Sequence, residues 1–330
     1  RRILLRLGRI RRRRRLMTRV AAVDCGTNSI RLLVADIDSR GRLVDVCREG
    51  EVVRLGHGVD ATGLIGAAPM ERTLAACGRY AQLCREAGAE AVRFVATSAS
   101  RDARNAADFV AGVERAFADF GVTPEVVSGD VEAQLSFSGA TGDLIAAEIP
   151  APYLVVDLGG GSTELVRGIR SAEAGFSMDV GSVRMSERHL HSDPPTDHEI
   201  ASATADVDAA IDKAKRVVDL TGIATLVGLA GSITTVTAHL LGLAAYDPKR
   251  IHLSRFTGAD HIAAATDLLM MSRDQRAALP YMHPGRVDVI GAGVLVWRRV
   301  LERVGADSPG AAVVTSEHDI LDGIALSLAR

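Results

Sequence analysis

The stretch VVDLGGGSTELV, residues 155–166, places an aspartate, three glycines and two hydroxyl residues between two apolar strands. Glycine permits positive φ angles and close approach, so consecutive backbone amides can point into one space and bind an anion. The negative charge of Asp157 cannot itself favour a phosphate. The expected role of this residue next to a bound phosphate is therefore to bind Mg²⁺. A strand follows the loop, whereas Walker and Rossmann fingerprints open a helix. A tight capped hairpin is the structural alternative. We predict a phosphate-binding loop formed by Gly159, Gly160, Gly161, Ser162 and Thr163.

A second loop, DCGTNS at residues 24–29, repeats this arrangement. A gapless alignment 133 residues apart pairs Asp24 with Asp157, Gly26 with Gly159, Ser29 with Ser162 and Leu32 with Leu165. Apolar strand patterns flank both loops, so we interpret the match as the duplication of a domain. Two such loops facing each other across a cleft would hold successive phosphates of one chain. The first loop contributes Asp24 as a metal ligand and, for phosphate, Gly26, Thr27, Asn28, Ser29 and Arg31.

Two further strand ends carry anion-binding residue types. GLAGSITT, residues 228–235, opens a helix whose N-terminus favours an anion near Gly231 and Ser232. A simple strand-to-helix turn capped by Ser232 is the alternative. ATSASRDARN, residues 96–105, offers Ser98 and Arg101, since arginine can clamp phosphate oxygens bidentately. A solvated arginine at a helix start is the alternative there.

Attack of water on a phosphoanhydride needs a group that orients or deprotonates the water. SGDVEAQLSF, residues 128–137, puts Asp130 and Glu132 at a strand-to-helix corner, so either side chain could overlook the cleft. Carboxylates are also common at helix starts because the helix dipole favours them. The residues alone therefore leave the identity of the base open.

The elements that must position these residues alternate between strands and helices. A meander at residues 19–49 is followed by a helix at 68–88, and a second meander begins at residue 153. A helix starts at residue 129, a loop is expected at 141–152, and a helix closes the chain at 318–329. This order predicts an α/β protein with a cleft between two domains. We expect an N-terminal domain at 17–138 and a C-terminal domain at 139–330.

Composition limits the classes of function. The chain of 330 residues has a net charge of −2, but residues 1–19 hold ten arginines and no acid, which leaves −12 for the remainder. An acidic body argues against nucleic acid as a partner. The sequence contains no apolar run long enough to span a membrane and no secretory signal. The four cysteines lack CxxC spacing, so reduced thiols and a cytoplasmic location are expected. Residues 1–16 are expected to be a disordered or mis-assigned basic extension.

Five segments together resemble a known family. VDCGTNSIRLLVAD, ATSASRDARN, SGDVEAQLSF, VVDLGGGSTELV and VGLAGSITT, in this order, resemble the exopolyphosphatase and pppGpp phosphohydrolase (Ppx/GppA) family in its short two-domain form. The resemblance implies an actin, sugar kinase and Hsp70-like fold of two ribonuclease-H-like (actin-like ATPase) domains with an interdomain cleft. It also implies a homodimer and an Mg²⁺-dependent hydrolase that releases orthophosphate from inorganic polyphosphate. Hydrolysis of pppGpp is the alternative activity.

The resemblance assigns roles to single residues. Glu132 matches the family's catalytic glutamate in S-G-x-x-E-A, so it is expected to activate the attacking water. Asp157 and Glu164 match acidic positions at the metal. Arg101 matches the phosphate-binding arginine, and Asp24 belongs to the first loop.

The chain also departs from the family pattern. It lacks the C-terminal helical domain of long members, so the resemblance does not extend to processive threading of long polymers. ILDG at residues 320–323 stands where the family often has L-R-E-G, so an arginine is missing there. Cys25 occupies a position that is more usually aliphatic. A non-catalytic sensor of (p)ppGpp or polyphosphate is the second hypothesis, and a kinase of the same superfamily is the third.

Overall fold

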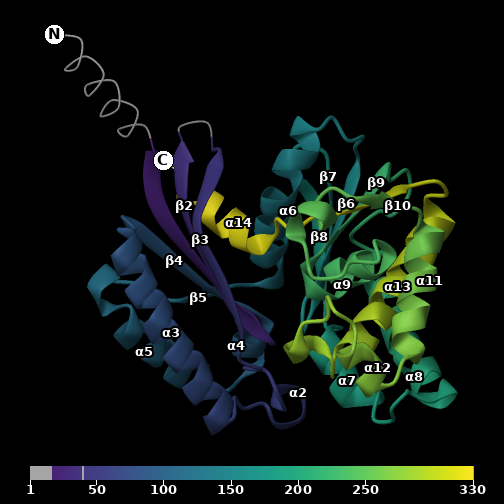
Figure 1. Cartoon of the computed structure of the whole chain (residues 1–330), viewed down its shortest axis with the longest axis horizontal. Coiled ribbons are helices and arrows are strands. Elements are labelled where there is room, and N and C mark those ends of the chain that lie inside the picture. The colour runs from purple at the N-terminus through teal and green to yellow at the C-terminus, as the bar shows by residue number, and fades with distance from the viewer. Residues whose placement is uncertain (1–16, 39–40, 330) are drawn as a thin grey trace.

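The computed structural model of the chain describes residues 17–38 and 41–329, and the expected basic extension at 1–16 lies outside them. Two mixed β-sheets lie side by side, each with its own helices (Figure 1). The predicted α/β fold built on two sheets is therefore confirmed. Within the described ranges, no helix combines the length and apolar character that crossing a membrane requires.

The first sheet has the strand order β3-β2-β1-β4-β5. An antiparallel meander forms one side of it, and two strands parallel to β1 form the other. On one face, strand residues such as Leu32 pack against Tyr80 and Phe109 of the covering helices. The elements are β1 (Met17–Cys25), β2 (Ser29–Asp38), β3 (Leu43–Val52), α2 (Val59–Thr62), α3 (Ala67–Ala87), β4 (Ala91–Ala96), α4 (Ser98–Asp102), α5 (Ala106–Ala116), η1 (Ala118–Phe120) and β5 (Glu125–Val126).

The second sheet has the order β10-β11-β9-β6-β7-β8. Its largest core lies between the sheet and a layer of helices in which Trp297 is fully buried. The elements are α6 (Gly129–Ala146), β6 (Tyr153–Leu158), β7 (Thr163–Gly168), β8 (Ala172–Met178), α7 (Ser182–His189), α8 (Asp197–Ala214), β9 (Thr225–Leu229), α9 (Ala230–Leu240), α10 (Pro248–Ile251), β10 (Arg255–Phe256), α11 (Gly258–Met270), α12 (Arg273–Ala277), η2 (Pro284–Arg286), α13 (Ile290–Asp307), β11 (Ala312–Thr315) and α14 (Ile320–Leu326).

The strand–loop–strand repeat that the sequence predicts is present in both sheets and extends to its hydrogen bonds. The Gly26 amide donates to the Ser29 carbonyl at 2.9 Å, and the Gly159 amide donates to the Ser162 carbonyl at 3.0 Å. Across the two hairpins, Asp24 lies opposite Arg31 and Asp157 lies opposite Glu164. A parallel strand then pairs with the first strand of each meander. The same strand–loop–strand unit therefore occurs once in each sheet.

Two helices join the halves of the molecule. α6 runs to Ala146, so the loop predicted at 141–152 is wrong over its first half. The helix continues there because Ala140 and Leu144 pack into a buried core, and a Cβ on the preceding Gly139 would lie 1.8 Å from the carbonyl oxygen of Asp319. α14 packs against α6 and against the first sheet, where Leu321 and Ile324 meet Val20 and Leu33 (Figure 1). The last helix of the chain thus returns to the first sheet.

Candidate active site

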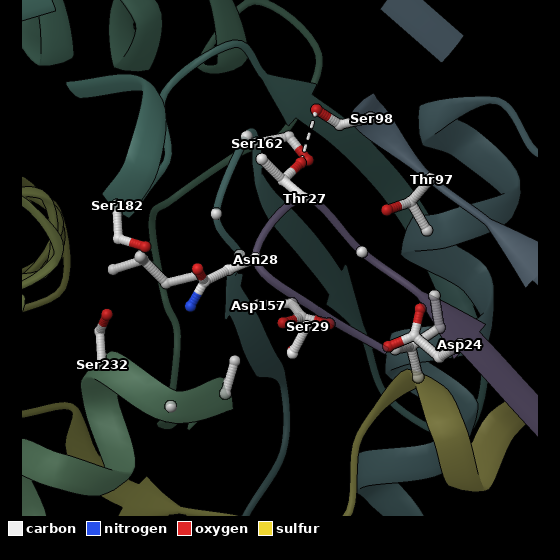
Figure 2. Close-up of a pocket in the computed structure, with 18 of the residues that line it drawn as sticks. Asp24, Thr27, Asn28, Ser29, Thr97, Ser98, Asp157, Ser162, Ser182 and Ser232 are labelled. Atoms are coloured by element: carbon white, nitrogen blue, oxygen red, sulfur yellow. Dashed lines mark hydrogen bonds between the residues drawn. The ribbon is translucent and has the colours of Figure 1, made fainter. Parts of the chain in front are cut away.

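A cleft with an empty volume of about 800 Å³ is lined by residues of both glycine loops. Figure 2 shows Asp157 and Ser29 near its middle, with Asp24 on one side and Ser182 and Ser232 on the other. Of the residues predicted for the site, only Arg101 and Thr163 do not line it. The lining members are Asp24, Gly26, Thr27, Asn28, Ser29, Arg31, Ser98, Glu132, Asp157, Gly159, Gly160, Gly161, Ser162, Glu164, Gly231 and Ser232.

The two loops meet at their tips and keep backbone amides free. A Cβ on Gly160 would lie 3.2 Å from the Asn28 amide nitrogen, and one on Gly161 would lie 2.6 Å from Thr27 Oγ1. Side chains at these two positions would therefore force the loops apart. Within the described residues, the amides of Thr27, Asn28, Gly160 and Gly161 have no hydrogen-bond acceptor. Each loop thus presents two unpaired donors beside the cleft, as an anion nest requires.

The third glycine loop contributes a helix end. α9 begins at Ala230 with Leu229 as its N-cap and no side-chain cap, so the alternative in which Ser232 caps the helix is wrong. An uncapped N-terminus leaves amide donors for an anion. Gly231 lies directly against the Arg286 guanidinium, since a Cβ there would lie 2.4 Å from Arg286 Nε and would displace that side chain.

Glu132 is placed in the cleft by the first turn of α6. Ser128 caps that turn by accepting the Val131 amide at 3.4 Å. Arg101 Nη1 donates to Glu132 Oε2 at 3.1 Å and to the Val127 carbonyl at 3.0 Å. Burial raises the pKa of Glu132 to about 7, with the Arg101 charge opposing and the Asp157 charge adding to the rise. A carboxyl with this pKa is poised to exchange a proton near neutral pH. Asp130, the other candidate base, is exposed and does not line the cleft.

Asp157 and Glu164 are both buried and lie opposite each other on the two strands of the second hairpin, next to its loop. Ser136 Oγ donates to Asp157 Oδ2 at 2.5 Å, and Ser177 Oγ donates to Glu164 Oε1 at 2.7 Å. Burial raises the pKa of Asp157 to about 7, an effect that the Asp319 charge increases and the Ser136 bond opposes. Burial, together with the charges of Glu132 and Asp157, also raises the pKa of Glu164 well above its usual value. Too little positive charge lies near these two carboxyl groups to stabilise their ionised forms in a buried site.

Arg31 is held between two aspartates. Its Nη2 donates to Asp24 Oδ2 at 2.6 Å, and its Nη1 donates to Asp319. Burial alone would raise the pKa of Asp319, but the charge and hydrogen bond of Arg31, the Leu321 amide and the Arg48 charge together outweigh burial and lower it. Asp319 was not among the predicted site residues. The one sequence signal for it is the capping box that it forms with Asp322 at the start of α14.

The charges lining the cleft suit a divalent cation. Four carboxylates (Asp24, Glu132, Asp157 and Glu164) face two guanidinium groups (Arg31 and Arg286) there. The partners just outside, Arg101 and Asp319, cancel each other, so the ionised cleft carries −2. The fully ionised cleft would repel a polyanion unless cations were added. Asn28 Oδ1 is in addition buried without a hydrogen-bond donor among the described residues. Hard oxygen ligands of this kind are those that Mg²⁺ prefers.

Sequence reasoning also missed Arg286. This residue of η2 lines the cleft beside Gly231, and its guanidinium lies 5.8 Å from the centre of the Tyr246 ring. Its Nη1 donates to Thr235 Oγ1 at 3.4 Å, and it forms no ion pair with any carboxylate in the described part of the chain. Arg31 and Arg101, in contrast, are both paired with carboxylates. An isolated arginine in HPGR carries no motif, which explains why the sequence did not reveal it.

Three positions differ from the sequence-based picture. Thr163 lies outside the cleft because its hydroxyl donates to the Val180 carbonyl at 2.6 Å. Arg101 does not line the cleft, and its guanidinium contacts the cleft residue Glu132. Leu321, which stands where the family often has arginine, is buried in the core between α14 and the first sheet and does not line the cleft.

Comparisons with known proteins show the family and agree with the overall fold. A model of the Ppx/GppA phosphatase family matches residues 33–328. Exopolyphosphatase 2 of Mycobacterium tuberculosis is 50% identical over 322 residues, covering 95% of this chain and 99% of that protein. The crystal structure of an exopolyphosphatase-like protein is 45% identical with a TM-score of 0.89, covering 95% and 99% of the two chains. The Aquifex aeolicus Ppx/GppA structure is 28% identical with a TM-score of 0.76, covering 94% and 97%.

Proposed function

The chain belongs to the Ppx/GppA phosphatase family, and from this premise we propose that it is an exopolyphosphatase that releases orthophosphate from the end of inorganic polyphosphate. The observation that carries the proposal is the position of Glu132. Its buried carboxyl, with a pKa of about 7, lies in the same cleft as the free amides of two glycine loops. Water activation and phosphate binding therefore share one site.

The loops bind the terminal phosphates. Free amides of Thr27 and Asn28 on one side and of Gly160 and Gly161 on the other donate to phosphate oxygens. Because the loops are anchored in two rigid sheets, the terminal phosphorus is held in a fixed direction relative to Glu132. Such positioning supplies much of the catalysis in phosphoryl transfer. Arg286 forms no ion pair with a carboxylate among the described residues, so its guanidinium is available to bind a phosphate further along the substrate.

Glu132 removes a proton from the attacking water. Arg101 Nη1 occupies Oε2, so Oε1 is the atom that accepts the proton. The water oxygen then bonds to the terminal phosphorus as the bridging P–O bond breaks. The products are orthophosphate and a polyphosphate shorter by one unit.

We assign Mg²⁺ to the carboxylates Asp157, Glu164 and Asp24. The ion supplies positive charge that neutralises the phosphate oxygens and the cleft. The three carboxylates are not within 4.8 Å of one another as a set. This spacing is consistent with Mg²⁺, which keeps several waters and takes one or two carboxylates plus substrate phosphates.

Substitution of Glu132 by glutamine tests the proposal. Glu132→Gln keeps the size of the side chain but cannot accept the proton, so orthophosphate release should fall by about 10² to 10⁴-fold. Binding of polyphosphate with Mg²⁺ should be retained. Asp130→Asn, two residues away on the same helix turn but exposed, is the matched control and should release orthophosphate at the normal rate. Normal turnover by Glu132→Gln would refute the assignment.

A panel of substrates separates the alternatives. Short polyphosphate, long polyphosphate and pppGpp are each assayed for orthophosphate release and for binding, with Mg²⁺ present. Release from polyphosphate supports the proposal, and release from pppGpp alone would replace it with the nucleotide activity. Saturable binding without release from any of them would indicate a sensor.

The location and assembly of the protein are proposals of the same kind. All four cysteines are free thiols, which supports a reducing cytoplasm as the place of action. The homodimer that the family resemblance implies stays a prediction, and sedimentation velocity at several concentrations tests it.

A further inference from the structure

A cluster of metal-ligating side chains lies outside the cleft, where three distant segments meet. Asp143 comes from the last turns of α6, His252 follows α10, and His318 lies in the loop between β11 and α14. His318 Nδ1 lies 2.8 Å from Asp143 Oδ2, and His252 Nε2 lies 3.2 Å from the same oxygen. All three ligand atoms lie within 4.8 Å of one another. Within the described residues, this is the one group of three such side chains that converges so closely.

The spacing of these atoms suits a small transition-metal ion. Ligands about 2.0–2.1 Å from a tetrahedral ion stand roughly 3.3 Å from each other. The contacts with Asp143 Oδ2 need little change to reach that separation. The imidazole rings are 4.6 Å apart between centres, and each already places one nitrogen within 3.2 Å of Asp143 Oδ2. Two imidazoles and one carboxylate favour zinc-class ions, whereas Mg²⁺ and Ca²⁺ favour oxygen ligands.

We propose that Asp143, His252 and His318 bind one divalent transition-metal ion of the zinc class, at a site separate from the cleft. The three side chains supply three ligands. Asp143 and His318 are 46% and 41% exposed, so water reaches the fourth position. The three-ligand set with one open position is a common form of zinc coordination.

Binding requires a defined rearrangement of protons. In the metal-free cluster both imidazoles direct a ring nitrogen at one carboxylate oxygen, and since an ionised carboxylate only accepts, each of these nitrogens must carry a proton to form a hydrogen bond. A metal takes the place of these protons, so each ring carries its proton on the other nitrogen. For His318 that nitrogen is Nε2. For His252 it is Nδ1, which in the metal-free protein accepts the Glu317 amide at 3.2 Å. Metal binding therefore breaks this bond and releases the Glu317 amide to another acceptor.

The location would let the ion link separate segments of the chain. The loop that carries His318 is the segment by which the chain returns from the second sheet to the first. The next residue, Asp319, caps α14 and pairs with Arg31 in the cleft. Asp143 belongs to α6, the other helix that joins the halves. An ion at this cluster would fasten α6, the segment after α10 and the return loop together.

Metal titration of the full chain tests the site. With excess Mg²⁺ present to occupy the cleft, Co²⁺ is added as a spectroscopic probe and Zn²⁺ as its competitor. We expect one Co²⁺ per chain with the visible absorption of a four- or five-coordinate N/O site, displaced by one equivalent of Zn²⁺. His252→Gln and His318→Gln should each weaken Co²⁺ binding at least about tenfold.

A matched control and a structural readout distinguish the site from surface histidines. His189 also contacts an aspartate, Asp206 at 2.9 Å, but Arg188 lies 3.3 Å from that carboxylate, so His189→Gln should leave Co²⁺ binding unchanged. Hydrogen exchange at the Glu317 amide should accelerate when Zn²⁺ is added to the wild-type chain. Co²⁺ affinity that is the same in wild type and both cluster variants, or no stoichiometric binding at all, would overturn the proposal.

Discussion

Replacing Glu132 by glutamine should change the stability of the protein in a pH-dependent way. The carboxyl is buried, with an exposed fraction of 7%, and its pKa lies at about 7 instead of 4.5. A raised pKa means that the folded protein holds a proton that the unfolded chain releases. The contribution of this proton to the free energy of unfolding is fully present below pH 4.5 and is lost as the pH rises through about 7.

The magnitude follows from the two pKa values. Raising the pKa from 4.5 to about 7 corresponds to roughly 3 kcal/mol of stability lost between those pH values. Glutamine resembles the protonated acid and carries no charge to bury. Glu132→Gln should therefore match the wild type near pH 4.5 and exceed it by up to roughly 3 kcal/mol at pH 8. At low pH neither the protonated Glu132 of the wild type nor the glutamine of the variant carries a charge that could pair with Arg101. The ion pair therefore does not affect the comparison at low pH.

Denaturant unfolding from pH 4.5 to pH 8 in EDTA measures the difference. Each free energy of unfolding is compared between Glu132→Gln and wild type at the same pH. Glu173→Gln, an exposed change of the same chemistry, should show no pH-dependent difference. A wild type that is more stable than Glu132→Gln at pH 8, or a gap that does not change with pH, would refute the reasoning.

Three further predictions concern other contacts. Ser136→Ala removes the 2.5 Å hydrogen bond that lowers the pKa of Asp157, so a proton should compete more strongly with Mg²⁺ for this carboxylate. The Mg²⁺ concentration for half-maximal orthophosphate release should rise about tenfold, and more at pH 6 than at pH 8. An unchanged Mg²⁺ requirement would contradict this. Gly139→Ala should lower the unfolding free energy by about 1–3 kcal/mol, since its Cβ would lie 1.8 Å from the Asp319 carbonyl oxygen. Gly142→Ala, on the same helix with open space around it, should be neutral or stabilising by up to about 1 kcal/mol in thermal unfolding. Arg286→Gln should raise KM for polyphosphate about tenfold with little change in kcat; an equal fall in kcat would instead place Arg286 at the reacting phosphate.

Local sequence determined the loops and their repetition. An aspartate at a strand end followed by glycines and hydroxyls has few backbone solutions, so Asp24 and Asp157 occupy equivalent hairpin positions, as predicted. The alternation of strands and helices likewise fixed the α/β class. The family resemblance added Glu132, which the spacing of residues alone could not distinguish from Asp130.

Only the tertiary structure decided how charge is distributed in the site. Arg31 and Asp319 are 288 residues apart in the chain, and no local pattern predicts that α14 returns to the first sheet and brings them together. The same return places the backbone of α14 against Gly139 of α6, where a Cβ would lie 1.8 Å from the Asp319 carbonyl oxygen. The pKa values near 7 of Glu132 and Asp157 arise from burial beside other carboxylates, a property of the assembled cleft. Local backbone preferences act over a few residues and are legible in sequence, whereas desolvation and charge pairing depend on which distant segments the fold brings into contact.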